Sequence, residues 1–272
     1  MRLPLGATLV SAILVLPLSA ATVDGLKLHS ATAGHGRKTV ILVHGWTCDS
    51  SSWSAQVPVL ARKYRVVTLD LPGHGQSQLP RGGKFSMELF AKAVEAARRP
   101  TGADKVVLVG HSMGTPVIRE YARLFPQHVA GLVLVDGLVQ IPQGMAAPQP
   151  AAMSGPGGLH AREDMVRGMF SAATPAPLQK RILAMMLRPP ASTAAGAMVA
   201  TFAASNWTDD VMTMPVLGIY ADKSQMAAPE YSKKIFPAFE YVEIPGTGHF
   251  VMMEKPKEFN RVLMAFLDKL SY

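Results

Sequence analysis

The sequence predicts an α/β domain built on a doubly wound, mostly parallel sheet. Short apolar runs rich in Val, Ile and Leu recur along the chain, and amphipathic segments separate them. Near-continuous apolar runs of this length are typical of strands buried on both faces of a parallel sheet. Regular alternation of strand and helix favours crossover connections that place helices over the sheet. A chain of 272 residues, 49% hydrophobic and 17% charged, can bury a core of that size.

The predicted elements follow the chain in order. Three helices are expected at 87–98, 115–125 and 256–270, and the last begins with Pro256, a residue favoured in the first turn. The core strands are predicted at 39–43, 64–69, 106–109, 132–135, 216–220 and 241–244.

One interval, residues 137–213, contains no convincing strand. Helical patterns occur near 161–171, 178–187 and 191–205, whereas the Pro-, Gly-, Ala- and Met-rich part at 140–158 is predicted to be a flexible connection. Long connections inside compact domains are usually functional or disordered, so we interpret the interval as a helical lid over the active site. The chain then divides into a signal peptide (1–21), a core domain in two parts (22–136 and 214–272) and the lid insertion (137–213).

The N-terminal segment has the pattern of a secretory signal peptide. A short basic start is followed by an apolar run to about Leu18 and by small residues at 19–21. A retained membrane anchor is the alternative, but Pro4 and Pro17 interrupt a run that is short for a span, so no stable span is expected after cleavage. The prediction is export to the periplasm or beyond the cell. With Cys48 as its sole cysteine, the chain can form no internal disulfide.

The charge distribution excludes several function classes. The formal charge is +8, but Lys and Arg are scattered and no basic run interleaves with aromatic residues, so nucleic-acid binding is not indicated. No His or Cys spacing suggests a metal site and no Gly-rich loop suggests nucleotide binding, so we expect no cofactor. The oligomeric state stays open.

The strongest chemical signal is the segment Gly110-His111-Ser112-Met113-Gly114. It follows a predicted strand and precedes a predicted helix, which is the context of a nucleophile elbow. A sharp strand-to-helix turn lifts the Ser112 hydroxyl clear of the backbone. Bulky side chains at 110 and 114 would collide with neighbouring elements, and the helix N-terminus supplies unpaired N–H groups.

Together with three further motifs, this segment resembles the α/β-hydrolase family, in its branch of esterases, lipases and cofactor-free haloperoxidases. The resemblance covers nearly all of the chain between the signal peptide and the C-terminus except the insertion. The further motifs are His44-Gly45-Trp46, the loop from Asp70 to Ser77, and Gly248-His249-Phe250.

The resemblance implies a role for each matching residue. Ser112 is the nucleophile, His249 is its general base, and the backbone N–H groups of Trp46 and Met113 form the oxyanion hole. His44 is expected to shape the oxyanion loop without transferring protons. The supporting residues of the elbow and oxyanion loop are His44, Gly45, Gly110, His111 and Gly114.

Two carboxylates compete for the role of triad acid. Asp136 ends one predicted strand and Asp222 follows the next. The usual family pattern after the later strand is Gly-x-x-Asp, but Ser224 stands where that acid is expected. Some family members carry the acid at the end of the earlier strand. Asp136 is therefore preferred, with Asp222 as the runner-up.

These residues predict a serine hydrolase that cleaves small to medium apolar carboxylic esters through an acyl-enzyme on Ser112. A serine nucleophile argues against dehalogenases and epoxide hydrolases of this fold, which use aspartate. A lactonase and a cofactor-free perhydrolase or haloperoxidase would use the same triad and stay open. A noncatalytic ligand-binding protein on this scaffold is the alternative from another class. Eight methionines in the insertion suggest either a pliable apolar pocket or ordinary helix packing.

Overall fold

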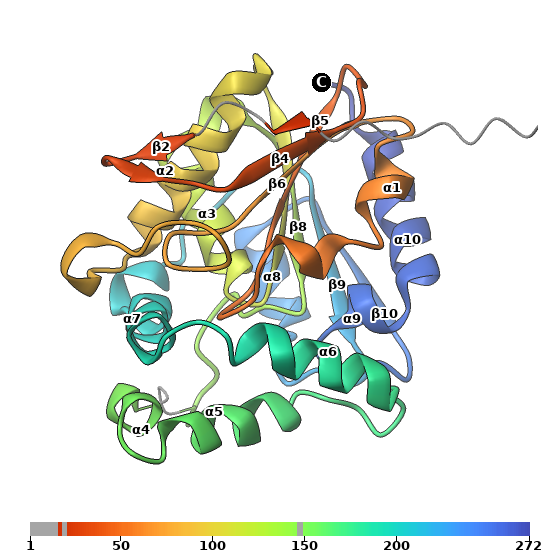
Figure 1. Ribbon diagram of the computed structural model, residues 1–272. Coiled ribbons are helices and arrows are strands. Elements are labelled where there is room, and N and C mark those ends of the chain that lie inside the picture. The colour runs from red at the N-terminus through yellow and green to blue at the C-terminus, as the bar shows by residue number, and fades with distance from the viewer. Residues whose placement is uncertain (1–15, 18–20, 146–148) are drawn as a thin grey trace, which may run out of the picture.

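The computed structural model describes residues 16–17, 21–145 and 149–272, and it is organised around one 8-stranded sheet (Figure 1). The strand order is β1-β4-β6-β5-β7-β8-β9-β10, and all neighbours from β6 to β10 are parallel. This confirms the predicted α/β sheet. Its six parallel strands are β5 (Thr39–Val43), β6 (Arg65–Leu69), β7 (Val106–His111), β8 (Val129–Val135), β9 (Val216–Ala221) and β10 (Phe239–Ile244).

Four short N-terminal strands were not expected from the sequence. β4 (Ser30–Ala33) pairs antiparallel with β6, and β1 (Leu16–Pro17) pairs antiparallel with β4. β2 (Thr22–Val23) and β3 (Leu26–Lys27) form a separate hairpin. These strands have two to four residues, and the sequence of β4 is Ser-Ala-Thr-Ala, so no apolar run in the sequence predicts them. Most of the predicted signal peptide, residues 1–15 and 18–20, lies outside the described residues.

Helices cover both faces of the sheet (Figure 1). α1 (Val57–Leu60) and α10 (Pro256–Lys269) lie together on one face, and α2 (Met87–Arg98) and α3 (Gly114–Leu124) lie together on the other. α8 (Pro229–Ile235) packs against β10, and α9 (Val251–Glu254) immediately precedes α10. Every residue of β5, β7 and β9 is buried, which explains their continuous apolar sequences.

Helices also fill the interval between β8 and β9. α4 (Pro150–Ser154), α5 (Gly158–Arg167), α6 (Ala176–Met186) and α7 (Ala191–Phe202) lie beyond one end of the sheet (Figure 1). No strand occurs in the part of this interval that the structure describes. The prediction of a flexible connection at 140–158 was wrong for α4, a short helix that begins at Pro150 and packs against α7. Across the described ranges, no helix has the length and apolar character needed to cross a bilayer.

Candidate active site

Ser112 occupies a sharp turn between β7 and α3. Its φ is 53°, a left-handed conformation that costs a non-glycine residue about 1–3 kcal/mol, and its N–H donates to Val135 O at 2.9 Å. The flanking glycines make the turn possible. A Cβ at Gly110 would lie 2.3 Å from Gly114 O, and one at Gly114 would lie 2.6 Å from Val43 O. The turn therefore requires glycine on both sides of the serine.

A buried imidazole–carboxylate pair lies beside this turn. His249 Nδ1 is 2.6 Å from Asp136 Oδ2, and Ala221 N–H donates to Asp136 Oδ1 at 3.0 Å. The side chains are 6% and 4% exposed, so water competes little for this contact. Because a carboxylate only accepts hydrogen bonds, Nδ1 carries the proton and Nε2 is left as the basic nitrogen.

The Asp136 carboxyl is held in its ionised form. Burial raises the pKa of Asp136, but the hydrogen bond and charge of His249 act in the opposite direction. The Ala221 amide hydrogen bond and the nearby Ser224 hydroxyl also favour the ionised form, so that pKa lies below its ordinary value. The backbone of Asp136 also has a positive φ, 41°, so backbone strain is stored at both Ser112 and Asp136.

The second predicted carboxylate is engaged elsewhere. Asp222 Oδ2 accepts a hydrogen bond from Gly246 N–H at 2.9 Å, at the entrance of the loop that carries His249. Of the two candidates, Asp136 is the one whose oxygen contacts the imidazole. Ser224, at the position of the usual family acid, instead helps to lower the pKa of Asp136.

The loop after β5 approaches Ser112 closely. A Cβ at Gly45 would lie 3.0 Å from Ser112 Cβ, and Thr47 has a φ of 51°. In the part of the chain that the structure describes, the backbone N–H groups of Trp46 and Met113 donate no intramolecular hydrogen bond. Both residues line the same cavity as Ser112, so these N–H groups are available as donors near it.

His44 fixes this loop through backbone contacts. Its Nδ1 donates to Gly45 O at 2.8 Å, and its Nε2 accepts from Leu71 N–H at 2.9 Å. Burial lowers the pKa of His44, so the ring stays neutral with Nε2 as an acceptor. Because both ring nitrogens of His44 are engaged in these hydrogen bonds, the contacts are those of a residue that stabilises the loop.

His111 and Met169 hold the backbone of His249 from two sides. His111 Nε2 donates to His249 O at 2.9 Å, and His249 N–H donates to Met169 O at 3.0 Å. Burial and the neighbouring His249 lower the pKa of His111 to about 3, so its ring is neutral at ordinary pH. One contact comes from the residue before Ser112 and the other from the insertion.

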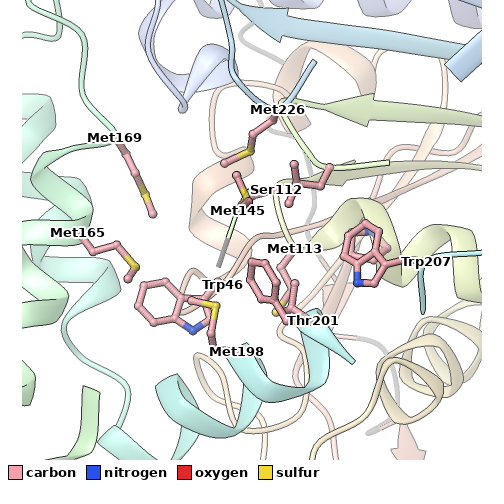
Figure 2. A pocket seen from close by; sticks show the side chains of 13 residues that line it. Trp46, Ser112, Met113, Met145, Met165, Met169, Met198, Thr201, Trp207 and Met226 are labelled. Atoms are coloured by element: carbon pink, nitrogen blue, oxygen red, sulfur yellow. The ribbon is translucent and has the colours of Figure 1, made fainter. Parts of the chain in front are cut away.

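A cavity of about 300 Å³ opens at Ser112, and the insertion forms much of its wall (Figure 2). None of its lining residues is charged. Four of the eight insertion methionines line it, while Met153, Met185, Met186 and Met212 are buried in packing. The lining consists of Trp46, Ser112, Met113, Pro116, Leu138, Met145, Met165, Met169, Met198, Thr201, Phe202, Trp207 and Met226.

Comparison with known proteins identifies the family of this chain. The sequence matches the α/β-hydrolase fold family over residues 38–256. The chain belongs to the α/β-hydrolase family. Among solved structures, an esterase from Thermogutta terrifontis superposes with a TM-score of 0.82 at 26% identity, covering 94% of this chain and 98% of that one.

Two curated relatives show how the similarity is distributed. The dihydrolipoyllysine-residue acetyltransferase component of the acetoin cleaving system of Pseudomonas putida is 30% identical over 87% of this chain and 65% of its own length. The pimeloyl-[acyl-carrier protein] methyl ester esterase of Methylococcus capsulatus is 43% identical over 39% of each chain. The matched part of this hydrolase covers about one third to two thirds of the length of the first curated relatives.

Several residues at the site of this hydrolase were missed by sequence reasoning. Leu138, Trp207 and Met226 line the cavity from loops, where apolar residues carry no periodic signal. Glu254 contacts the loop of His249, although nothing in its local sequence distinguishes it from a solvated charge. Among the described residues, no cluster of three or more His, Cys, Asp or Glu side chains could hold a metal ion.

Proposed function

We propose that this hydrolase is a serine esterase that cleaves small to medium, uncharged carboxylic esters through an acyl-enzyme on Ser112. The observation that carries the proposal is the position of Ser112. It lies in an apolar cavity, and its backbone is bonded to Val135, the neighbour of the carboxylate that contacts His249. This backbone link supports the assignment of Ser112 as nucleophile beside His249 as base and Asp136 as orienting acid.

In the acylation step, Ser112 Oγ attacks the ester carbonyl carbon while His249 Nε2 takes the hydroxyl proton. The resulting oxyanion accepts hydrogen bonds from the Trp46 and Met113 N–H groups, each worth about 2.7–4 kcal/mol of barrier lowering. The tetrahedral intermediate collapses by breaking the bond to the alcohol oxygen, which receives the proton from His249. Asp136 keeps the imidazole in the productive tautomer and stabilises its positive charge.

In the deacylation step, His249 removes a proton from water as the water oxygen attacks the acyl-enzyme carbonyl. The second tetrahedral intermediate breaks the bond to Ser112 Oγ, and the serine recovers its proton from His249. The products are a carboxylic acid and an alcohol, and the enzyme returns to its starting state.

The cavity supports uncharged apolar substrates. Its lining presents thioether, indole and hydrocarbon surface, so a charged acyl chain would lose hydration without gaining an ion pair. Methionine side chains adapt to irregular apolar shapes, which favours a range of acyl or alcohol groups. A volume of about 300 Å³ suits small to medium substrates.

The test is covalent labelling combined with turnover. A fluorophosphonate is expected to label wild-type protein at Ser112, and p-nitrophenyl butyrate is expected to be hydrolysed. Ser112→Ala should abolish both, whereas the exposed control Ser271→Ala should retain both. Saturable ligand binding without labelling or turnover would support a binding protein. Faster turnover of lactones, or faster peroxide-dependent halogenation, than of any ester would identify the alternative reactions.

We further propose that the movable lid is the first half of the insertion, α4 and α5. The second half is tied to the core, since Trp46 Nε1 donates to Ala194 O at 2.8 Å and Thr193 Oγ1 donates to Gly73 O at 3.0 Å. In contrast, Arg162 of α5 donates to Pro189 O, within the insertion itself. Labelling Ser112 with a long-chain phosphonate should slow hydrogen exchange in α5 more than in α7. Equal slowing in both helices would count against this division.

Export of the chain is likewise a proposal. It is supported by the basic start, the apolar run and the small residues at 19–21. Mass spectrometry of the intact protein after expression with its own N-terminus should give the mass of a chain that starts at residue 21 or 22. A mass that includes residue 1 would contradict cleavage.

A further inference from the structure

Glu254 joins two segments that are far apart in the sequence. Its Oε2 accepts hydrogen bonds from Gly248 N–H at 2.9 Å, from Thr174 Oγ1 at 2.9 Å and from Ser171 Oγ at 3.2 Å. Gly248 precedes the base His249, whereas Ser171 and Thr174 belong to the insertion. One carboxylate oxygen therefore binds the histidine loop and the insertion at the same point.

The two segments are also in direct contact. His249 N–H donates to Met169 O at 3.0 Å, and a Cβ at Gly248 would lie only 2.6 Å from Ser171 N. Ser171 N–H in turn donates to Thr174 Oγ1 at 2.9 Å, which closes the insertion segment on itself. Glycine at 248 is thus required by close backbone packing.

The histidine loop needs such external support. It contains Gly246 and Gly248 within four residues, and glycine has the largest backbone freedom to lose on folding. A base that takes a proton from serine must be held at hydrogen-bond distance, and a 1 Å error can reduce the rate about 10²-fold.

We propose that Glu254 is a positioning residue that holds the His249 loop against the 169–174 segment and so fixes the imidazole relative to Ser112. The inference rests on the proposed function, in which His249 is the general base. It also assigns residues 169–174 to the stationary part of the insertion, since they are bonded to the base. Glu254 acts through the backbone of Gly248 and touches no substrate.

The kinetic test compares Glu254→Ala and Glu254→Gln with Glu230→Ala, a control whose side chain is 85% exposed. Glu254→Ala is expected to lower kcat for p-nitrophenyl acetate about tenfold or more, with KM within about threefold. Glu254→Gln keeps an acceptor oxygen and should recover part of kcat. The control should match wild type. A loss confined to thermal stability, with kcat unchanged in both Glu254 variants, would overturn the inference.

A second measurement does not depend on catalysis. Hydrogen exchange at the Gly248 and His249 amides, and across 169–174, should be at least about tenfold faster in Glu254→Ala and in Thr174→Val than in wild type. If Glu254→Ala fails to fold, Glu254→Gln and Thr174→Val supply the same comparison. Unchanged hydrogen exchange in both segments would refute the proposal that Glu254 holds the His249 loop against residues 169–174. Wild-type protein without phosphonate labelling would instead refute the proposed esterase, so the two failures can be told apart.

Discussion

His111 Nε2 donates a 2.9 Å hydrogen bond to the carbonyl oxygen of His249. The residue before the proposed nucleophile Ser112 therefore fixes the backbone of the residue proposed to be its base. Both side chains are buried, and their rings lie 4.7 Å apart between centroids. Because this contact passes from the elbow directly to the histidine loop, a displacement of one is transmitted to the other.

Removal of this hydrogen bond is expected to reduce the rate and the stability. His111→Leu leaves the His249 carbonyl without its donor, which should cost about 1–3 kcal/mol of unfolding free energy. It should also lower kcat about 10- to 100-fold through misplacement of the imidazole. His111→Gln, with an amide donor, should recover part of both. Urea unfolding and ester kinetics measure the two effects, and a kcat within twofold of wild type in His111→Leu would contradict the expectation.

Substitution of the two strand-end carboxylates, Asp136 and Asp222, should have very different effects on kcat. Asp136→Asn removes the negative charge that orients His249 Nδ1 and should lower kcat roughly 10³- to 10⁴-fold at neutral pH. Asp222→Asn retains an acceptor for Gly246 N–H and should stay within about threefold of wild type. The comparison uses the same p-nitrophenyl ester for both variants. A larger loss in Asp222→Asn would show that the wrong carboxylate has been assigned.

The dependence of kcat/KM on ester chain length should reveal how much apolar chain the cavity can hold. Each CH₂ that enters it contributes about 0.8 kcal/mol, so kcat/KM should rise up to about fourfold per carbon until the cavity is filled. Met198→Ala removes three heavy atoms from the wall and should move the optimum to acyl or alcohol chains longer by about two carbons. A p-nitrophenyl series from acetate to decanoate, with an alkyl acetate series, measures both. A profile independent of length, or an optimum unmoved in Met198→Ala, would contradict the assignment of the cavity.

Acid should destabilise the protein through its buried histidines. Burial, together with neighbouring His44, lowers the pKa of His74 to about 3, whereas an unfolded histidine titrates near 6.5. Between these values the unfolded state binds the proton and the folded state does not, so stability falls as pH falls through this window. From pH 7 to pH 5 the loss attributable to His74 should be about 2 kcal/mol. Urea unfolding at both values should give a smaller drop for His74→Asn than for wild type, and equal drops would contradict the prediction.

Features encoded in short stretches of sequence could be predicted. The apolar runs of the six parallel strands, and the elbow from Gly110 to Gly114, depend on residues that are adjacent in the chain. Helices α5, α6 and α7 were also expected, because their periodicity is local. β4 was not, because four small or polar residues form a strand only when β6 offers them an edge.

The sequence by itself determined the serine on its strand-to-helix turn, the His44-Gly45-Trp46 loop after β5 and the presence of a late histidine. Only the tertiary structure decided which carboxylate meets that histidine. Asp136 and Asp222 follow the adjacent strands β8 and β9, and it is the Asp136 oxygen that contacts the imidazole, whereas Asp222 accepts a hydrogen bond from Gly246 N–H. It also decided that Glu254 and His111 hold the histidine loop. Most of these contacts join residues separated by tens to hundreds of positions, and their distances depend on how the whole chain packs.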